Sequence, residues 1–273
     1  MSKKEQDTTT TAEPAPTPAS KLKPGCHIVL VAQNKGGEAK STSALEVHMA
    51  ALASGIPSVI ATLDQSNKTL ATALGGSEKI MSLDMGSAND LQRALNDAMD
   101  VAENAGAILV LDTPPTYVDD NHPLIPALTR SRVFETENSI AAIVPIRPIG
   151  DSVMGAVDAI RVMPVDFARG LIRAWHHDPA APKWESIPGY NDLLTNKNFA
   201  VWTVGTWLQT TQDIIHKQAD FSTYPNLDEL EEYFDSKGMT HSRFERSAMR
   251  VTLAHFEDAR KAIFEHLLRP IIA

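Results

Sequence analysis

The feature that most constrains the fold lies in residues 26–54, where an apolar run, a glycine-rich loop and a helix-like segment follow one another. The run CHIVLVA over residues 26–32 is long enough for a strand but too short for a helix, and its near-continuous apolar character is typical of a strand buried on both faces. Residues 41–54 carry apolar side chains at helical spacing and precede Gly55 and Pro57, which end helices. The sequence therefore predicts a strand, a loop and a helix in direct succession.

The same alternation of strand-like and helix-like segments continues along the chain. Strands are predicted over residues 58–63, 107–112, 139–146, 170–175 and 200–205, and helices over residues 89–105, 150–163 and 243–268. This alternation favours a three-layer α/β/α architecture with a mostly parallel, twisted sheet that helices cover on both faces. The spacing of Asn226 to Glu229, and of Ser242 to Glu245, is that of a capping box and predicts two helix starts. We expect one domain over residues 25–273 with a helical C-terminal part.

Composition narrows the class of protein. Residues 1–24 are rich in Thr, Pro, Ala and Lys, and their low apolar content predicts a disordered N-terminal tail. The single cysteine, Cys26, can form neither a disulfide framework nor a thiolate metal cluster within one chain. No stretch approaches the roughly 18 apolar residues of a transmembrane helix, and no apolar block of a secretory signal is present. We therefore expect a cytoplasmic protein. Its formal net charge of −9 disfavours coating of nucleic acid, so any DNA contact would be a local patch.

The loop over residues 34–42 has the composition of a phosphate-binding loop. Its glycines allow several backbone N–H groups to point inward at a helix N-terminus, where the Lys40 ammonium group can hold the β- and γ-phosphates of a nucleotide. The hydroxyl group of Ser41 would then bind Mg²⁺. An ordinary turn that contains two glycines and a lysine is the alternative interpretation. The strand before the loop and the helix after it favour the phosphate site.

Residues 35–42, KGGEAKST, resemble the deviant Walker A motif KGGxGK[ST][ST] of the ParA/MinD family of dimeric ATPases. Two later segments resemble further motifs of that family. Residues 62–67, TLDQSN, are similar to its Asp-x-Asp-Pro-Gln segment, and residues 108–115, which contain LVLDTPP, are similar to its Walker B strand. Pro145 in AIVPIRP resembles the proline of the family's next strand. The resemblance covers about residues 26–165.

The resemblance implies a P-loop ATPase that binds ATP or ADP with Mg²⁺ and forms a homodimer through its nucleotide face. Lys35 would reach the phosphates of the partner subunit, and Lys40 would contact the nucleotide of its own chain. Asp64 matches the carboxylate that positions the attacking water, and Asp112 would hold Mg²⁺ through water, together with Ser41. The implied catalytic residues are Lys35, Lys40 and Asp64, and the implied nucleotide-binding residues are Lys35, Gly36, Gly37, Glu38, Ala39, Lys40, Ser41 and Thr42.

Both carboxylates also have a structural interpretation. Asp112 could form a turn before Pro114, and Asp64 could cap the N-terminus of a following helix. Their order and spacing after the same loop favour the functional interpretation.

The chain departs from the family pattern at three positions. Ala39 replaces the glycine that precedes the P-loop lysine, and an alanine held at positive φ costs roughly 1 to 2 kcal/mol. Thr62 replaces the first aspartate of the second motif, and Gln65 stands where proline is common. We therefore expect slow hydrolysis. The ending LLRPIIA, with Pro270, differs from the basic amphipathic tail of membrane-seeking relatives, so we expect no membrane binding.

Three hypotheses for function follow. The first is a ParA-like ATPase that partitions, positions or transfers plasmid DNA or another cargo, with a protein partner of the adaptor or centromere-binding type. Arg243, Arg246 and Arg250 lie at helical spacing and could bind DNA without reading its sequence, although a solvated helix face is the alternative. The second hypothesis is a nucleotide-binding adaptor with little or no turnover. The third is a ligase that resembles dethiobiotin synthetase. Arg173 is a candidate for recognition of the nucleotide base.

Overall fold

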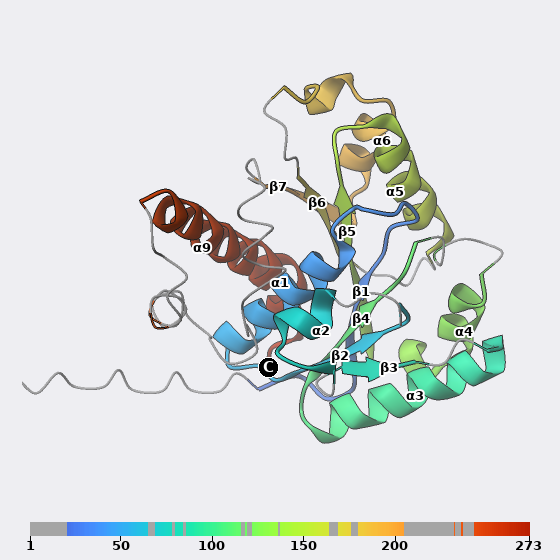
Figure 1. Cartoon of the computed structure of the whole chain (residues 1–273). Coiled ribbons are helices and arrows are strands. Elements are labelled where there is room, and N and C mark those ends of the chain that lie inside the picture. The colour runs from blue at the N-terminus through green and yellow to red at the C-terminus, as the bar shows by residue number, and fades with distance from the viewer. Residues whose placement is uncertain are drawn as a thin grey trace, which may run out of the picture.

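The computed structural model describes residues 21–64, 69–77, 80–83, 86–115, 118, 122–135, 137–163, 169–175, 180–204, 232, 236 and 243–273. Within these residues, seven strands form one sheet in the order β3-β2-β4-β1-β5-β6-β7, and every pairing is parallel (Figure 1). The strands are β1 (His27–Val31), β2 (Ser58–Thr62), β3 (Ile80–Ser82), β4 (Ile108–Asp112), β5 (Ser139–Ile146), β6 (Arg169–Ala174) and β7 (Phe199–Thr203).

Helices connect and cover these strands. The α-helices are α1 (Lys40–Ala53), α2 (Thr69–Ala73), α3 (Ala88–Asn104), α4 (Leu124–Arg130), α5 (Gly150–Val162), α6 (Tyr190–Thr195) and α9 (Arg243–Ile263). Three short 3-10 helices, Arg132–Phe134, Trp184–Ser186 and Arg269–Ile271, and a π-helical turn, Phe264–Leu268, complete the described elements.

The sheet has a hydrophobic core on each face, which makes the three layers that the alternation predicts. Along β1, Ile28 and Leu30 belong to the core that α3, α4, α5 and α6 cover, whereas Val29 and Val31 belong to the core under α1, α2 and α9. Because successive side chains of a strand point to opposite faces, an unbroken apolar run supplies both cores at once. Figure 1 shows the two groups of helices on either side of the sheet. The predicted α/β/α architecture is confirmed.

Most predicted elements are present, and the differences have local causes. β3, α2, α4 and α6 were missed because they have only 3, 5, 7 and 6 residues, too few for a periodic pattern. The described chain starts ahead of the predicted boundary at residue 25, since Leu22 forms an antiparallel bridge with Ile272. The helix predicted over residues 243–268 ends as α9 at Ile263 and continues as the π-helical turn. The helix start predicted at residues 226–229 and the capping residue Ser242 lie outside the described residues.

Candidate functional site

The glycine-rich loop joins the carboxyl end of β1 to the N-terminus of α1. β1 lies between β4 and β5, so the loop emerges in the middle of the sheet, where ligands of open α/β sheets bind. Two loop residues have left-handed backbone conformations, Gly37 with φ 74° and Ala39 with φ 62°. No side-chain hydrogen bond caps α1, whose first N–H groups have no carbonyl partners within the helix. The loop thus presents a helix N-terminus, with its partial positive charge, to an anion.

Lys40, the first residue of α1, lies at the centre of the charged groups of the site. Its Nζ donates a hydrogen bond to the carbonyl oxygen of Lys35 at 3.1 Å. Burial lowers the pKa of Lys40, while the negative charges of Asp112 and two further carboxylates, Glu38 and Asp64, act in the opposite direction. The structure therefore brings both predicted aspartates within electrostatic range of the predicted P-loop lysine.

Ser41 and Asp112 face each other inside the protein. The Oγ atom of Ser41 donates a hydrogen bond to Oδ2 of Asp112 at 3.0 Å, and Asp112 is 1% exposed. Thr113 donates from Oγ1 to the carbonyl oxygen of Val31 at 2.7 Å, which fastens the end of β4 to the end of β1. Asp112 therefore lies beside the loop because two neighbouring strands end there, and its turn-forming interpretation does not account for the buried side chain.

The pair of oxygen ligands fits a magnesium ion. Among the described residues, Oδ1 of Asp112 has no hydrogen-bond partner although it is buried. Burial raises the pKa of Asp112 to about 7, against the effects of the Ser41 hydrogen bond and the Lys40 charge. A hydroxyl oxygen beside a carboxylate with an unused lone pair is the donor chemistry that Mg²⁺ and its bound water prefer.

Asp64 follows β2, the strand next to β4. Thr62 is aligned with Asp112 across the two strands, and its Oγ1 accepts a hydrogen bond from the backbone N–H of Asp64 at 3.0 Å. The side chain of Asp64 is partly exposed. The residues directly after Asp64 lie outside the described part of the chain, so the alternative that Asp64 caps a helix stays a prediction.

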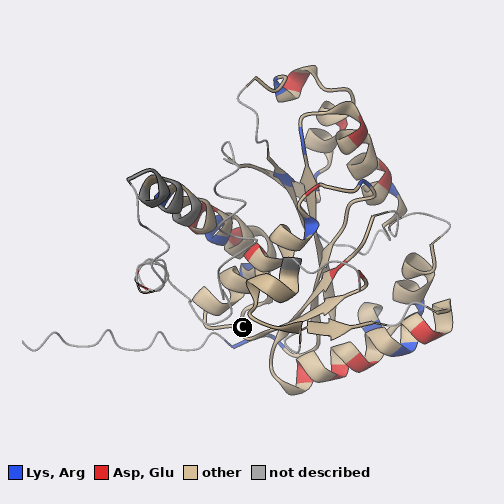
Figure 2. Cartoon of the chain, in the orientation of Figure 1, with Lys and Arg blue, Asp and Glu red and all other residues tan. Residues whose placement is uncertain are grey.

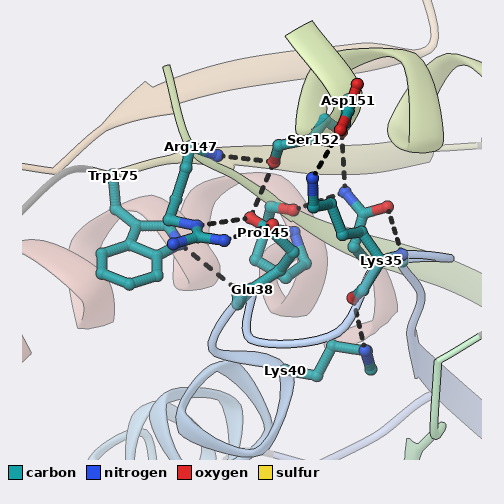
Figure 3. Close-up of polar contacts among 9 residues, drawn as sticks. Lys35, Glu38, Lys40, Pro145, Arg147, Asp151, Ser152 and Trp175 are labelled. Atoms are coloured by element: carbon teal, nitrogen blue, oxygen red, sulfur yellow. Dashed lines mark hydrogen bonds and ion pairs between the residues drawn. The ribbon is translucent and has the colours of Figure 1, made fainter. Parts of the chain in front are cut away.

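Glu38 has an arrangement that the sequence did not reveal. Its side chain is 0% exposed and accepts hydrogen bonds from Arg147, through Nε at 3.1 Å and Nη2 at 2.9 Å, and from Ser152 Oγ at 2.7 Å (Figure 3). Its carbonyl oxygen accepts a hydrogen bond from Nε1 of Trp175 at 3.2 Å. Glu38 was expected to bind nucleotide with the rest of the loop, but its carboxylate is engaged by protein groups. The sequence contained one hint of these contacts, which is the presence of an acidic residue between the two glycines of the loop and Lys40.

Lys35 lies on the other side of the loop, against the N-terminus of α5 (Figure 3). Its Nζ is 3.0 Å from Oδ2 of Asp151, and the two side chains are 31% and 88% exposed. Its backbone N–H donates to Oε1 of Gln33, whose Nε2 donates to the carbonyl oxygens of Pro145 and Ser152. Lys35 therefore makes an ion pair within its own chain.

Comparison with solved structures identifies the fold. MinD in the MinC:MinD cell division complex of Aquifex aeolicus superposes with a TM-score of 0.52 at 13% identity, over 88% of this chain and 96% of that chain. The pNOB8 ParA structure superposes with a TM-score of 0.51 at 11% identity, over 88% of this chain and 99% of that one. The chain has the fold of the ParA/MinD-type P-loop ATPases. No protein-family model matches the sequence, and no curated protein is significantly similar to it.

Within this ParA/MinD-type fold, Arg173 does not lie where a nucleotide base could contact it. Its side chain is 0% exposed and pairs with Glu46 of α1, with Nε to Oε2 at 2.6 Å and Nη2 to Oε1 at 2.7 Å. The rings of Trp175 and Trp202 each lie 5.7 Å from its guanidinium carbon. The prediction of Arg173 as a base-recognition residue is wrong, because alternation along β6 directs this side chain into the core under α1.

The predicted DNA-binding arginines lie on α9 of this ParA/MinD-type fold. Of Arg243, Arg246 and Arg250, only Arg250 has a described side chain, and it is exposed. Acidic and basic residues both occur on α9 (Figure 2), and Nη2 of Arg260 lies 2.6 Å from Oε1 of Glu257. DNA binding by this helix stays a prediction. None of the helices in the described part of the chain has the length and apolar character needed to cross a membrane.

Proposed function

We propose that the chain is a ParA-like ATPase that uses ATP-dependent dimerisation and slow hydrolysis to position, partition or transfer a cargo such as plasmid DNA. The observation that carries the proposal is the meeting of Lys40, Ser41 and Asp112 at the glycine-rich loop of a ParA/MinD-type fold. Phosphoryl transfer is catalysed mainly by positioning and by neutralising charge on the γ-phosphate, and no covalent nucleophile is needed. The grouped charges supply those requirements.

Each site residue has a role in this proposal. The N–H groups at the start of α1 and the ammonium group of Lys40 bind the β- and γ-phosphates of ATP. Ser41 directly and Asp112 through water hold Mg²⁺, which when bound neutralises phosphate charge. Asp64 positions the attacking water, which its partly exposed place beside Lys40 supports. Lys35 contacts the nucleotide of the partner subunit.

Dimerisation makes ATP a switch. Nucleotide that lies in the interface stabilises the dimer by mass action, and hydrolysis removes the γ-phosphate contact of Lys35. Size-exclusion chromatography with light scattering in ADP and in a non-hydrolysable ATP analogue tests this. We expect a dimer only with the analogue, and a monomer in both for Lys35→Ala. A wild-type protein that stays monomeric at saturating analogue would refute the switch.

Binding of nucleotide itself is tested by titration calorimetry with Mg-ATP. Lys40→Ala should bind far more weakly than the wild type, because it removes the ammonium group that binds the β- and γ-phosphates in this proposal. Unchanged affinity would show that the loop has been misassigned.

The adaptor hypothesis rests on Ala39 and on the altered second motif, with Thr62 and Gln65, which together would prevent useful turnover. Ala39 keeps the positive φ that suits a glycine, which supports an intact loop at that position. Phosphate release with and without DNA distinguishes the two hypotheses, since an adaptor gives none.

The proposed partners are a second copy of the chain, a protein partner and non-specific DNA. The similar MinD structure was determined in complex with MinC, which supports a protein partner. DNA binding through Arg243, Arg246 and Arg250 would weaken steeply with added salt and require ATP. An absence of DNA retardation at low salt would contradict it.

A further inference from the structure

Ala39 holds a backbone conformation that an alanine avoids. It is the only non-glycine residue with positive φ in the described part of the chain, at φ 62° and ψ 35°. A left-handed backbone brings Cβ close to the carbonyl oxygen. This strain alone would favour a loop with an ordinary right-handed or extended Ala39, here called the relaxed loop, over the observed loop by about 5- to 30-fold. Ala39 precedes Lys40 directly, so relaxation there would turn the N–H groups of the loop away from a bound phosphate. Neighbouring groups must therefore hold the loop.

The preceding residue, Glu38, is held from three directions. Arg147, which follows β5, gives two hydrogen bonds to its carboxylate, and Ser152 of α5 gives a third. Ser152 is itself fixed, because its Oγ accepts the backbone N–H of Arg147 at 2.8 Å. Trp175, which follows β6, holds the carbonyl oxygen of Glu38. The carboxylate and the carbonyl oxygen of Glu38 therefore accept hydrogen bonds from residues at the ends of β5 and β6 and in α5 (Figure 3).

These contacts are strong enough to hold a strained neighbour. Hydrogen bonds between a guanidinium and a carboxylate are about twice as strong as neutral ones, and a bidentate pair also fixes orientation. The carboxylate is 0% exposed, so solvent does not screen it, while Arg147 is 23% exposed. The guanidinium carbon of Arg147 lies 6.0 Å from the ring centre of Trp175, which keeps the two donors together.

We propose that Glu38 is a positioning residue whose buried contacts with Arg147, Ser152 and Trp175 keep Ala39 left-handed and so hold the loop in its phosphate-binding shape. This inference rests on the proposed function for its nucleotide readout only. In this chain Glu38 directly precedes Ala39, and the contacts of Glu38 offset the conformational strain at Ala39. Removing Glu38 should then matter less when a glycine occupies position 39.

A cycle of four proteins tests the coupling: wild type, Ala39→Gly, Glu38→Gln and the double variant. The effect of Ala39→Gly on Mg-ATP affinity in the wild type, whose loop already has the binding shape, is the reference for the cycle. Glu38→Gln should lower affinity by about tenfold, because the relaxed loop predominates. Adding Ala39→Gly to Glu38→Gln should recover about fivefold or more of that loss. Equal effects of Ala39→Gly in both backgrounds would overturn the inference.

Urea unfolding tests the same coupling without nucleotide. Here the effect of Ala39→Gly should be larger in the wild type than in the Glu38→Gln background, the reverse of its effect on affinity. Ala39→Gly should increase the unfolding midpoint of the wild type, which carries the strain, and have little effect in the Glu38→Gln background, whose loop has relaxed. The larger unfolded-state freedom of glycine is common to both backgrounds and cancels in the difference. Equal stabilisation by Ala39→Gly in both backgrounds would overturn the inference, whether or not the wild type binds nucleotide. A wild type that binds no nucleotide would refute the proposed function alone.

Two further variants control for general destabilisation. Leu95→Ala opens a cavity in the core on the face of the sheet opposite α1, away from the contacts of Glu38, and Ala39→Gly should have its wild-type effects in that background. Should Glu38→Gln fold poorly, Glu38→Gln with Arg147→Met removes both charges and leaves no buried unpaired ion. The same recovery of affinity by Ala39→Gly is expected in that background, and its absence would count against the inference.

Discussion

Deprotonation of Asp112 should destabilise the nucleotide-free protein as the pH rises. Burial raises the pKa of Asp112 to about 7 from the ordinary 3.8, so the folded state holds a proton that the unfolded state releases. The contribution of this neutral carboxyl is fully present below the unfolded pKa and is lost as the pH rises through about 7. With 1.36 kcal/mol for each unit of pKa difference, the full loss is about 4 kcal/mol. The slope in between is about 1.4 kcal/mol per pH unit.

The assay is urea unfolding at several pH values between about 5 and 8, on the wild type and on Asp112→Asn, without nucleotide or Mg²⁺. The asparagine carries no titrating proton and keeps an oxygen that can accept the hydrogen bond from Ser41. Subtracting the two curves removes titration of all other groups. The difference between the two free energies of unfolding should change by about 2.5 kcal/mol between pH 5 and pH 8, with the curve levelling off above pH 7. Parallel curves for the two proteins would refute the assignment of a raised pKa to Asp112.

The same proton should oppose Mg²⁺, because metal binding requires the ionised carboxylate. Affinity for Mg-ATP should therefore increase as the pH rises toward about 7 and become constant above it. An affinity that is independent of pH across this range would show that Asp112 takes no part in holding the metal.

Three more predictions concern the lysine of the loop and the core under α1. Lys40→Ala should lower Mg-ATP affinity by about 2 to 3 kcal/mol, as calorimetry would measure, and an intact affinity would contradict the role of Lys40. Glu46→Gln should destabilise the protein by about 3 kcal/mol in urea unfolding, because it leaves the buried Arg173 guanidinium without its carboxylate, whereas Glu46→Met with Arg173→Met should recover most of that loss. Burial, assisted by the charge of Arg173, lowers the pKa of His255 to about 3, so the stability that its neutral form provides is present above pH 6.5 and lost as the pH falls toward 3. His255→Gln should therefore reduce acid denaturation below pH 6.5, and an unchanged acid limb would contradict the assignment.

The parts of the fold that were predictable are those where one residue pattern has one physical solution. β1 and β4 are apolar on both faces, so their sequences are nearly continuous apolar runs that only a covered parallel sheet accommodates. The loop was predictable because its glycines and lysine lie between such a strand and a helix. β3, by contrast, has three residues and no periodic pattern of its own, and its pairing with β2 depends on long-range contacts.

The charged groups of the site were predictable in position but not in partnership. Lys40, Ser41 and Asp112 follow strands that are neighbours in the sheet, so their meeting follows from topology. The ion pairs of Glu38 with Arg147 and of Glu46 with Arg173 join residues more than a hundred positions apart. A single sequence contains no local signal for such a pairing, because any acidic and any basic residue could satisfy it.

The ion pair between Lys35 and Asp151 has a consequence for how quickly two subunits could engage. Exposed ion pairs of this kind stabilise a protein by about 0.2 to 1 kcal/mol, since water competes for both charges. This range is comparable to thermal energy, so the ion pair between Lys35 and Asp151 would be open for a substantial fraction of the time. Release of Lys35 from its own chain would then be no kinetic obstacle, and the lifetime of an assembled pair would depend on the contacts that form rather than on those that break.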